Sequence, residues 1–365
     1  MNDMNSFFRL SHNHKLIFFS LLSVLVLISA SCSKPDNDLP EPIKPEYIGK
    51  GFFVLNQGNF TAGNSSLSFY NYDSARMINN FFYQKNDLPL GDVGHSVSIW
   101  NDYAFIVVNN SSTIWSMNAS TGKVVAKLSG LYSPRYIQVI DAEKAYVSDF
   151  NYTGVTVINP SNLQILGNIN TGKTTENLLL YDTKVFTTNW TNYNQTTENN
   201  TVQVIDARFD KVSDSIVVAK EPNSMVLDKN ERLWVLCSGG FMEEEYPALF
   251  RINPKTLSIE KRFNFPSKSM APEALTINNT ADTLYFINYH IYQMALTDDQ
   301  LPDTPWVESN GNSFYRVAVD PNNNMILVSD VGNYMENGYV FRYKYDGMLV
   351  DSIGAGIIPA FFAFN

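Results

Sequence analysis

The sequence has little of what several common protein functions require. Its 365 residues hold 26 lysines and arginines against 36 aspartates and glutamates, a net charge of −10, and the basic residues form no cluster. Because nucleic-acid binding needs clustered positive charge, we exclude it as a function. Only four histidines occur, two of them within the first 15 residues, so no metal site built from histidines is expected. Motifs for a serine nucleophile elbow or a phosphate-binding glycine loop are absent, and we predict neither catalytic residues nor a cofactor.

Two cysteines are present, Cys32 and Cys237. If Cys32 lies outside the folded core, Cys237 has no other cysteine there with which to form a disulfide. Cys237 lies in an apolar segment and is predicted to be an ordinary core residue. Cys32 follows a different pattern: Arg9 and Lys15 precede an apolar run at 16–28, and three small residues then lead to Cys32. The run is too short to span a membrane comfortably, so residues 1–31 are predicted to be a signal peptide.

A cysteine directly after small residues resembles the bacterial lipobox, although Ser29 stands where that motif usually carries leucine. The resemblance implies that Cys32 is lipidated and anchors the protein; ordinary signal cleavage beside an unmodified cysteine is the alternative. Residues 32–47 are proline-rich and acidic, and we predict an extended tether. Acidic residues soon after the cysteine resemble the surface-export signal of Bacteroidota lipoproteins. The expected location is therefore the outer membrane, lipid-anchored and facing the cell exterior.

The remaining chain, 48–365, is built from repeated hairpins. Two examples, 155–172 and 249–267, share apolar alternation on both sides of an Asn-Pro turn. Two further strands precede most hairpins, and no long amphipathic helical pattern occurs. Aromatic residues recur at the centre of the second strand at intervals of 40 to 52 residues, with isoleucine in the last copy: Phe53, Phe105, Tyr146, Phe186, Trp234, Tyr285 and Ile326. This spacing and strand number are typical of propeller blades.

The two ends of this region complement each other. Residues 358–365 match a first strand with nothing after it, and the segment beginning at Lys50 matches a second strand with nothing before it. We therefore predict an all-β, seven-bladed β-propeller of four-stranded antiparallel blades, closed by pairing of the N- and C-terminal strands in one blade. A hairpin is predicted at 67–82, and the sixth blade, around 291–307, lacks a clear hairpin turn.

The segments beginning at Gly51, Ser133 and Ile158 ("GFFVLNQGNF", "SPRYIQVI", "INPSNLQILGNINTG"), behind a lipobox-like start, resemble the YncE-like seven-bladed propeller lipoproteins of Bacteroidota. Some members of that group, the BtuG-type proteins, capture cobalamin at the cell surface beside an outer-membrane transporter. The resemblance covers nearly all of 49–365. It implies the fold and a possible ligand class, and no binding residue is carried over from it.

We name as the working face the side of the ring that carries the loops between second and third strands and the loops between blades. Its loops are long and rich in aromatic residues, which suit a large semi-polar ligand; about half of these rings are expected to pack against neighbouring blades instead. Four polar candidates from the blade-to-blade loops are placed near the channel mouth: His95, Arg135, Glu176 and Glu273. Inter-blade hydrogen bonding is the alternative role for all four, and it is the expected role of Arg135, which follows Pro134. The predicted ligand-binding residues are Phe60, His95, Arg135, Asp149, Tyr152, Glu176, Trp190, Tyr193, Phe241, Tyr289 and Tyr334.

Three functions fit these patterns. The first is a non-catalytic surface receptor that binds a large nutrient, a corrinoid such as cobalamin above all, and delivers it to an outer-membrane transporter. The second is a lactonase- or lyase-type propeller enzyme with a divalent metal in the channel. The third is an adhesive or structural propeller that binds a protein or a glycan. We expect the first.

Overall fold

The computed structural model describes residues 46–190 and 199–365, and the propeller comprises the described part of Tyr47–Asn365. The signal peptide, Cys32 and most of the tether lie outside the described residues. Within the described residues, no helix is long and apolar enough to cross a membrane.

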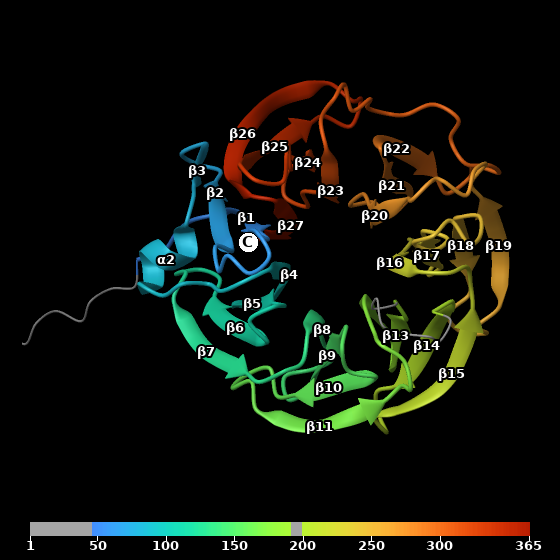
Figure 1. Ribbon diagram of the computed structural model, residues 1–365, viewed down its shortest axis with the longest axis horizontal. Helices are drawn as coiled ribbons and strands as arrows, with labels where there is room; N and C mark the ends of the chain where they lie inside the picture. The colour runs from blue at the N-terminus through green and yellow to red at the C-terminus, as the bar shows by residue number, and fades with distance from the viewer. Residues whose placement is uncertain (1–45, 191–198) are drawn as a thin grey trace, which may run out of the picture. The chain divides into compact units, whose positions relative to one another are not determined.

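Seven antiparallel sheets are arranged in a ring, with the first strand of each at the centre (Figure 1). Blade 1 contains β27 (Pro359–Phe364), β1 (Gly51–Asn56), β2 (Ser66–Asn71) and β3 (Arg76–Ile78). Blade 2 contains β4 (Gly94–Trp100), β5 (Tyr103–Val108), β6 (Thr113–Asn118) and β7 (Val124–Ser129). Blade 3 contains β8 (Pro134–Val139), β9 (Ala145–Asp149), β10 (Gly154–Ile158) and β11 (Ile165–Asn170). Blade 4 contains β12 (Leu178–Tyr181), β13 (Lys184–Thr188), β14 (Thr201–Asp206) and β15 (Lys211–Val217). Blade 5 contains β16 (Pro222–Leu227), β17 (Leu233–Cys237), β18 (Ala248–Ile252) and β19 (Ile259–Asn264). Blade 6 contains β20 (Glu273–Ile277), β21 (Thr283–Asn288) and β22 (His290–Ala295). Blade 7 contains β23 (Phe314–Val319), β24 (Ile326–Asp330), β25 (Asn337–Tyr343) and β26 (Leu349–Ile357).

The predicted closure is confirmed. β27 pairs antiparallel with β1, with Phe53 opposite Ala363 and Leu55 opposite Phe361, and the Asn365 amide donates to the Gly51 carbonyl at 2.9 Å. The C-terminus accordingly lies beside β1 in Figure 1. Blade 1 is therefore assembled from strands about 300 residues apart, and no strand edge is left open at the joint.

The hydrophobic core lies between the blades. Each of the seven buried clusters of the described residues draws its members from two neighbouring blades: Phe186 of blade 4 packs with Leu233 of blade 5, and Trp234 of blade 5 packs with Phe286 of blade 6. Second strands such as β17 are buried along their whole length because a neighbouring blade covers each of their faces. The recurring aromatic positions therefore mark inter-blade packing.

Two predictions about individual strands are wrong. The predicted hairpin 67–82 ends early: β3 stops at Ile78, and a short helix, α2 (Phe81–Asn86), follows. Phe81 and Phe82 are both buried, which consecutive residues of a strand facing one core achieve poorly, whereas one helical turn directs both rings into the cluster between blades 1 and 2. The fourth strand of blade 6 is missing from the described sheet. An isolated bridge between Ile291 and Val307 covers part of the edge of β22 in its place.

Candidate ligand site at the mouth of the central channel

The candidate site lies at the working-face end of the first strands. A cavity of about 80 Å³, which we call the central cavity, opens there. Its lining comes from blades 2 to 7: His95, Arg135, Tyr136, Glu176, Trp190, Asn223, Glu273, Ala274, Tyr315 and Arg316.

A repeated β-bulge directs these side chains toward the centre. In six of the seven first strands of the described structure, the register against the second strand shifts near the working-face end. The extra residues include His95 in β4, Arg135 and Tyr136 in β8, Asn223 in β16 and Tyr315 in β23. A bulge bends the strand and re-aims one side chain, so the same position of each repeat is free to carry a different polar group.

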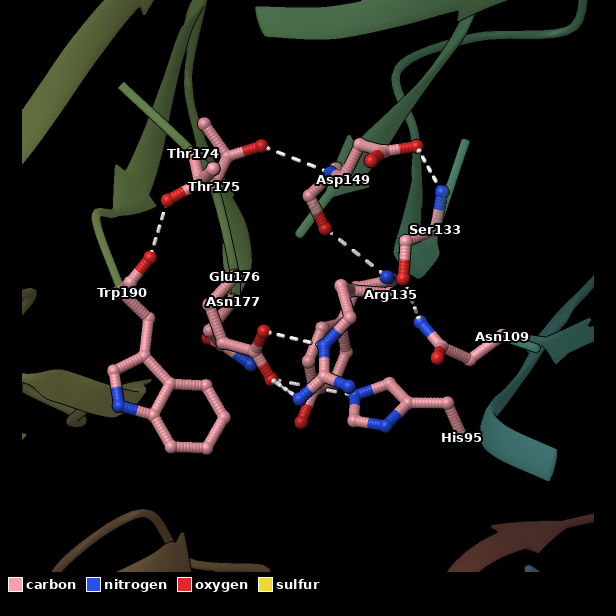
Figure 2. A network of polar contacts seen from close by, with 12 residues as sticks. His95, Asn109, Ser133, Arg135, Asp149, Thr174, Thr175, Glu176, Asn177 and Trp190 are labelled. Carbon is pink, nitrogen blue, oxygen red and sulfur yellow. Dashed lines mark hydrogen bonds and ion pairs between the residues drawn. The ribbon is translucent and has the colours of Figure 1, made fainter. Parts of the chain in front are cut away.

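Arg135 and Glu176 form the strongest polar contact in the site. Arg135 Nε donates to Glu176 Oε2 at 2.6 Å, and Arg135 Nη2 donates to Oε1 at 2.8 Å, so blades 3 and 4 are joined by a two-pronged ion pair (Figure 2). Both side chains are nearly inaccessible, at 12% and 3% exposure. His95 Nε2 lies 3.3 Å from Glu176 Oε1. The inter-blade interpretation of Arg135 is therefore confirmed, and the three predicted polar residues lie together.

Burial and the ion pair set the charges of this group. Burial disfavours both ions, but each partner outweighs it, so the pKa of Glu176 is lowered and the pKa of Arg135 is raised. For His95 the surroundings disfavour the charged form: burial, and then the positive charge of Arg135, lower its pKa to about 4. At neutral pH the site therefore contains an uncharged His95 beside a charged Arg135–Glu176 pair.

Asp149 stabilises the loops next to the site. Its carboxylate accepts backbone N–H groups from Ser133, at 2.9 Å, and from Asn151 and Tyr152, at 2.8 and 2.9 Å. The side chain is buried, and burial raises its pKa although these bonds oppose the shift. Asp149 was predicted to bind ligand; in the structure its carboxylate is occupied by backbone groups and holds the loop that carries Phe150 and Tyr152.

Trp190 lies at the border of the cavity within an aromatic group. Its ring stacks on Phe241 with centroids 5.8 Å apart, Phe150 lies 6.0 Å away, and the Arg135 guanidinium carbon is 5.4 Å from the Trp190 ring centre. The sequence predicted an exposed ring on a polar loop, whereas Trp190 is partly buried, because its neighbours come from blades 3 and 5. Its Nε1–H is buried and has no hydrogen-bond partner among the described residues.

The other predicted aromatic residues are distributed around the working face. Phe60 and Tyr289 are about 70% exposed, and Tyr334 contacts Tyr315 edge-on. Tyr152 stacks on Tyr132, which the sequence did not single out. Tyr193 lies outside the described residues. These rings therefore form several separate groups around the face.

Five lining residues were not predicted: Tyr136, Asn223, Ala274, Tyr315 and Arg316. A usable signal exists for one of them and for Glu273, because a proline directly precedes Arg135, Asn223, Glu273 and Ala360 at the same point of four blades. Tyr315 and Arg316 follow Phe314 and have no such marker. Among the described residues, no group of three or more His, Cys, Asp or Glu side chains is placed to hold a metal ion.

Comparison with solved structures supports the fold. The chain superposes on a quinoprotein alcohol dehydrogenase-like protein from Bacteroides thetaiotaomicron with a TM-score of 0.67 at 17% identity, covering 87% of this chain and 79% of that one. The periplasmic gluconolactonase of Pseudomonas aeruginosa gives 0.64 at 10% identity, covering 86% and 98%. Apo AztD from Citrobacter koseri gives 0.56 at 10% identity, covering 87% and 98%. At these identities the likeness shows the propeller fold alone.

Sequence comparison assigns the family. The sequence matches none of the curated proteins. A family model described as a domain of unknown function, DUF5074, matches residues 50–355, which is most of the chain and nearly all of the propeller. The chain therefore belongs to the DUF5074 family.

Proposed function

We propose that this protein binds a bulky organic ligand on its working face without converting it chemically. The observation that carries the proposal is Trp190, which borders the central cavity with a buried Nε1–H that has no hydrogen-bond partner within 46–190 and 199–365. A buried donor without a partner costs about 1–3 kcal/mol, so such a group calls for a specific explanation. A ligand acceptor that reaches Nε1 provides one.

The size of the cavity determines how such a ligand sits. Pockets that enclose a whole small molecule have volumes of about 300–1,000 Å³. At about 80 Å³, the central cavity has room for one substituent only. The body of the ligand then lies outside it, on the aromatic group of Phe150, Trp190 and Phe241 and on the exposed rings around it. Flat, wide molecules with polar edges suit this arrangement.

Corrinoids are the ligand class that we propose first. They are flat and wide and carry polar side chains at the edge, and the sequence resembles the BtuG-type cobalamin-binding proteins. In this proposal the protein is anchored to the outer membrane through Cys32, faces the exterior and delivers the ligand to an outer-membrane transporter. The lipobox-like sequence and the acidic tether support that location.

Isothermal titration with cyanocobalamin and with cobinamide tests the proposal. We expect Trp190→Ala to weaken binding roughly thirtyfold or more, equivalent to about 2 kcal/mol, as for an aromatic hot spot. The ring also packs on Phe150 and Phe241, so we expect a modest decrease in melting temperature as well. Trp190→Phe retains an aromatic ring but removes the N–H, and it is expected to weaken binding with a smaller effect on melting.

Tyr345→Ala provides the matched control. This ring is 75% exposed and lies on the turn between β25 and β26, on the face opposite the working face, so its loss is expected to leave affinity unchanged. No heat of binding with either corrinoid would remove the corrinoid from the proposal. Unchanged affinity in Trp190→Ala, for any ligand found to bind, would remove the site.

A further inference from the structure

Glu273 and Arg316 carry opposite charges into the central cavity without forming an ion pair. Glu273 comes from β20 of blade 6 and Arg316 from β23 of blade 7. The Glu273 carboxylate has no hydrogen-bond partner among the described residues and is influenced by Arg316 only at longer range. Arg316 Nε donates to the Ala360 carbonyl at 3.0 Å, and its guanidinium lies 4.9 Å from the Phe361 ring centre. The Arg135–Glu176 pair, by contrast, is closed by two hydrogen bonds.

Glu273 lies exposed at the rim of the cavity, and its carboxylate is not paired with any described residue. Desolvation by the cavity lining raises the pKa of Glu273, and Arg316 only partly opposes the shift. The side chain remains accessible from the cavity, so a group placed there can reach it. The other two charges of the lining neutralise each other, and His95 is uncharged at neutral pH. The cavity therefore has no net charge but offers one free anionic acceptor and one cationic donor group.

We propose that the central cavity holds a primary carboxamide, or an equivalent uncharged group with both a donor and an acceptor, of the ligand bound on the working face. Its NH₂ group donates to Glu273 and its carbonyl accepts from Arg316. A carboxylate in the same place would be repelled by Glu273, and an ammonium group would be repelled by Arg316. A carboxamide has three heavy atoms, which fits a cavity of about 80 Å³.

This inference depends on the proposed function in one respect, that ligands bind at this face, but its test does not need a corrinoid. Nicotinamide and nicotinate have the same shape and differ in carrying a carboxamide or a carboxylate on an aromatic ring. Their dissociation constants for the full-length protein can be measured by saturation-transfer NMR. We expect nicotinamide to bind at least tenfold more tightly than nicotinate, about 1.4 kcal/mol.

Glu273→Gln is the decisive variant because it keeps the shape of the side chain, removes the charge and breaks no hydrogen bond to the described protein. We expect the preference for nicotinamide to fall below about threefold, mainly because nicotinate binds better. Glu336→Gln removes an equal charge from an exposed position of a working-face loop, and it is expected to retain the tenfold preference.

Equal binding of the two probes to the native protein, no binding of either, or an unchanged preference in Glu273→Gln would overturn the inference. Cyanocobalamin titrated in parallel separates this outcome from failure of the proposed function. If cyanocobalamin binds and the probes show no preference, the carboxamide subsite is wrong and the receptor proposal stands. If the preference is present and no corrinoid binds, the subsite stands and the corrinoid is wrong.

Discussion

Removal of the Glu176 carboxylate is expected to destabilise the propeller strongly. Glu176→Ala leaves the Arg135 guanidinium without its two hydrogen bonds at a position where its side chain is 12% exposed. Breaking a buried ion pair from one side costs about 3–5 kcal/mol, because the remaining charge is neither paired nor hydrated. Urea unfolding at pH 7, followed by tryptophan fluorescence, measures the difference directly.

Two comparisons isolate the buried charge as the cause. Arg208 and Asp206 form a similar two-pronged pair, but on the exposed outer part of blade 4, so Asp206→Ala is expected to change stability little. The double variant Arg135→Met/Glu176→Leu leaves no unpaired charge, and we expect it to recover most of the stability lost in Glu176→Ala. A loss below about 1 kcal/mol in Glu176→Ala would refute the reasoning.

The pH dependence of this pair has a definite sign. Because the pKa of Glu176 in the folded protein is below the ordinary value of 4.5, ionised Glu176 stabilises the protein fully above that pH. The contribution is lost as the pH falls through the lowered pKa of the folded state. The difference in stability between the native protein and Glu176→Gln should therefore be constant near neutral pH and shrink below about pH 4.5. A difference that grows on acidification would contradict the assignment.

Three further predictions concern the anchor, the closure and the thiol. Cys32→Ala should release the protein from the outer-membrane fraction, since acyl chains provide the anchor; unchanged fractionation would argue against lipidation. Deletion of 357–365 removes β27 and uncovers the inner edge of β1, so we expect aggregation or a large drop in melting temperature, and a truncated protein that melts like the intact one would contradict ring closure by β27. Cys237 is fully buried, and burial raises its pKa, so an exposed-thiol reagent should label it only after unfolding.

The fold could be predicted from the sequence because a propeller repeats the same strand pattern in every blade. Each blade supplies an apolar second strand, so Phe53, Tyr146 and Trp234 reveal the period even though no single strand is diagnostic. The exceptions arise where a local event replaces a strand. At Phe81 and Phe82 a helical turn buries two adjacent rings, and in blade 6 the Ile291–Val307 bridge replaces a strand.

The site could be predicted only in part. His95, Arg135 and Glu176 were identified because each precedes or begins a first strand and carries a charge or an imidazole. Asn223 and Tyr315 were missed because a bulge breaks the alternation that predicts which side chains point inward. The partners of a side chain also come from distant segments, so the loop around Trp190 gave no sign that Phe150 and Phe241 would cover it.

Because β1 pairs with β27, β1 cannot complete its sheet until the C-terminal strand has been synthesised. Roughly 300 residues separate the two strands, and at about 5–20 residues per second the ribosome needs on the order of 15–60 s to make them. During that interval β1, with its run of buried apolar residues, has its hairpin partner β2 but lacks the strand that covers its inner edge. The growing chain therefore has an unpaired strand edge at β1 for most of its synthesis. Until β27 is made and pairs with β1, that edge is open to pairing with strands of other chains.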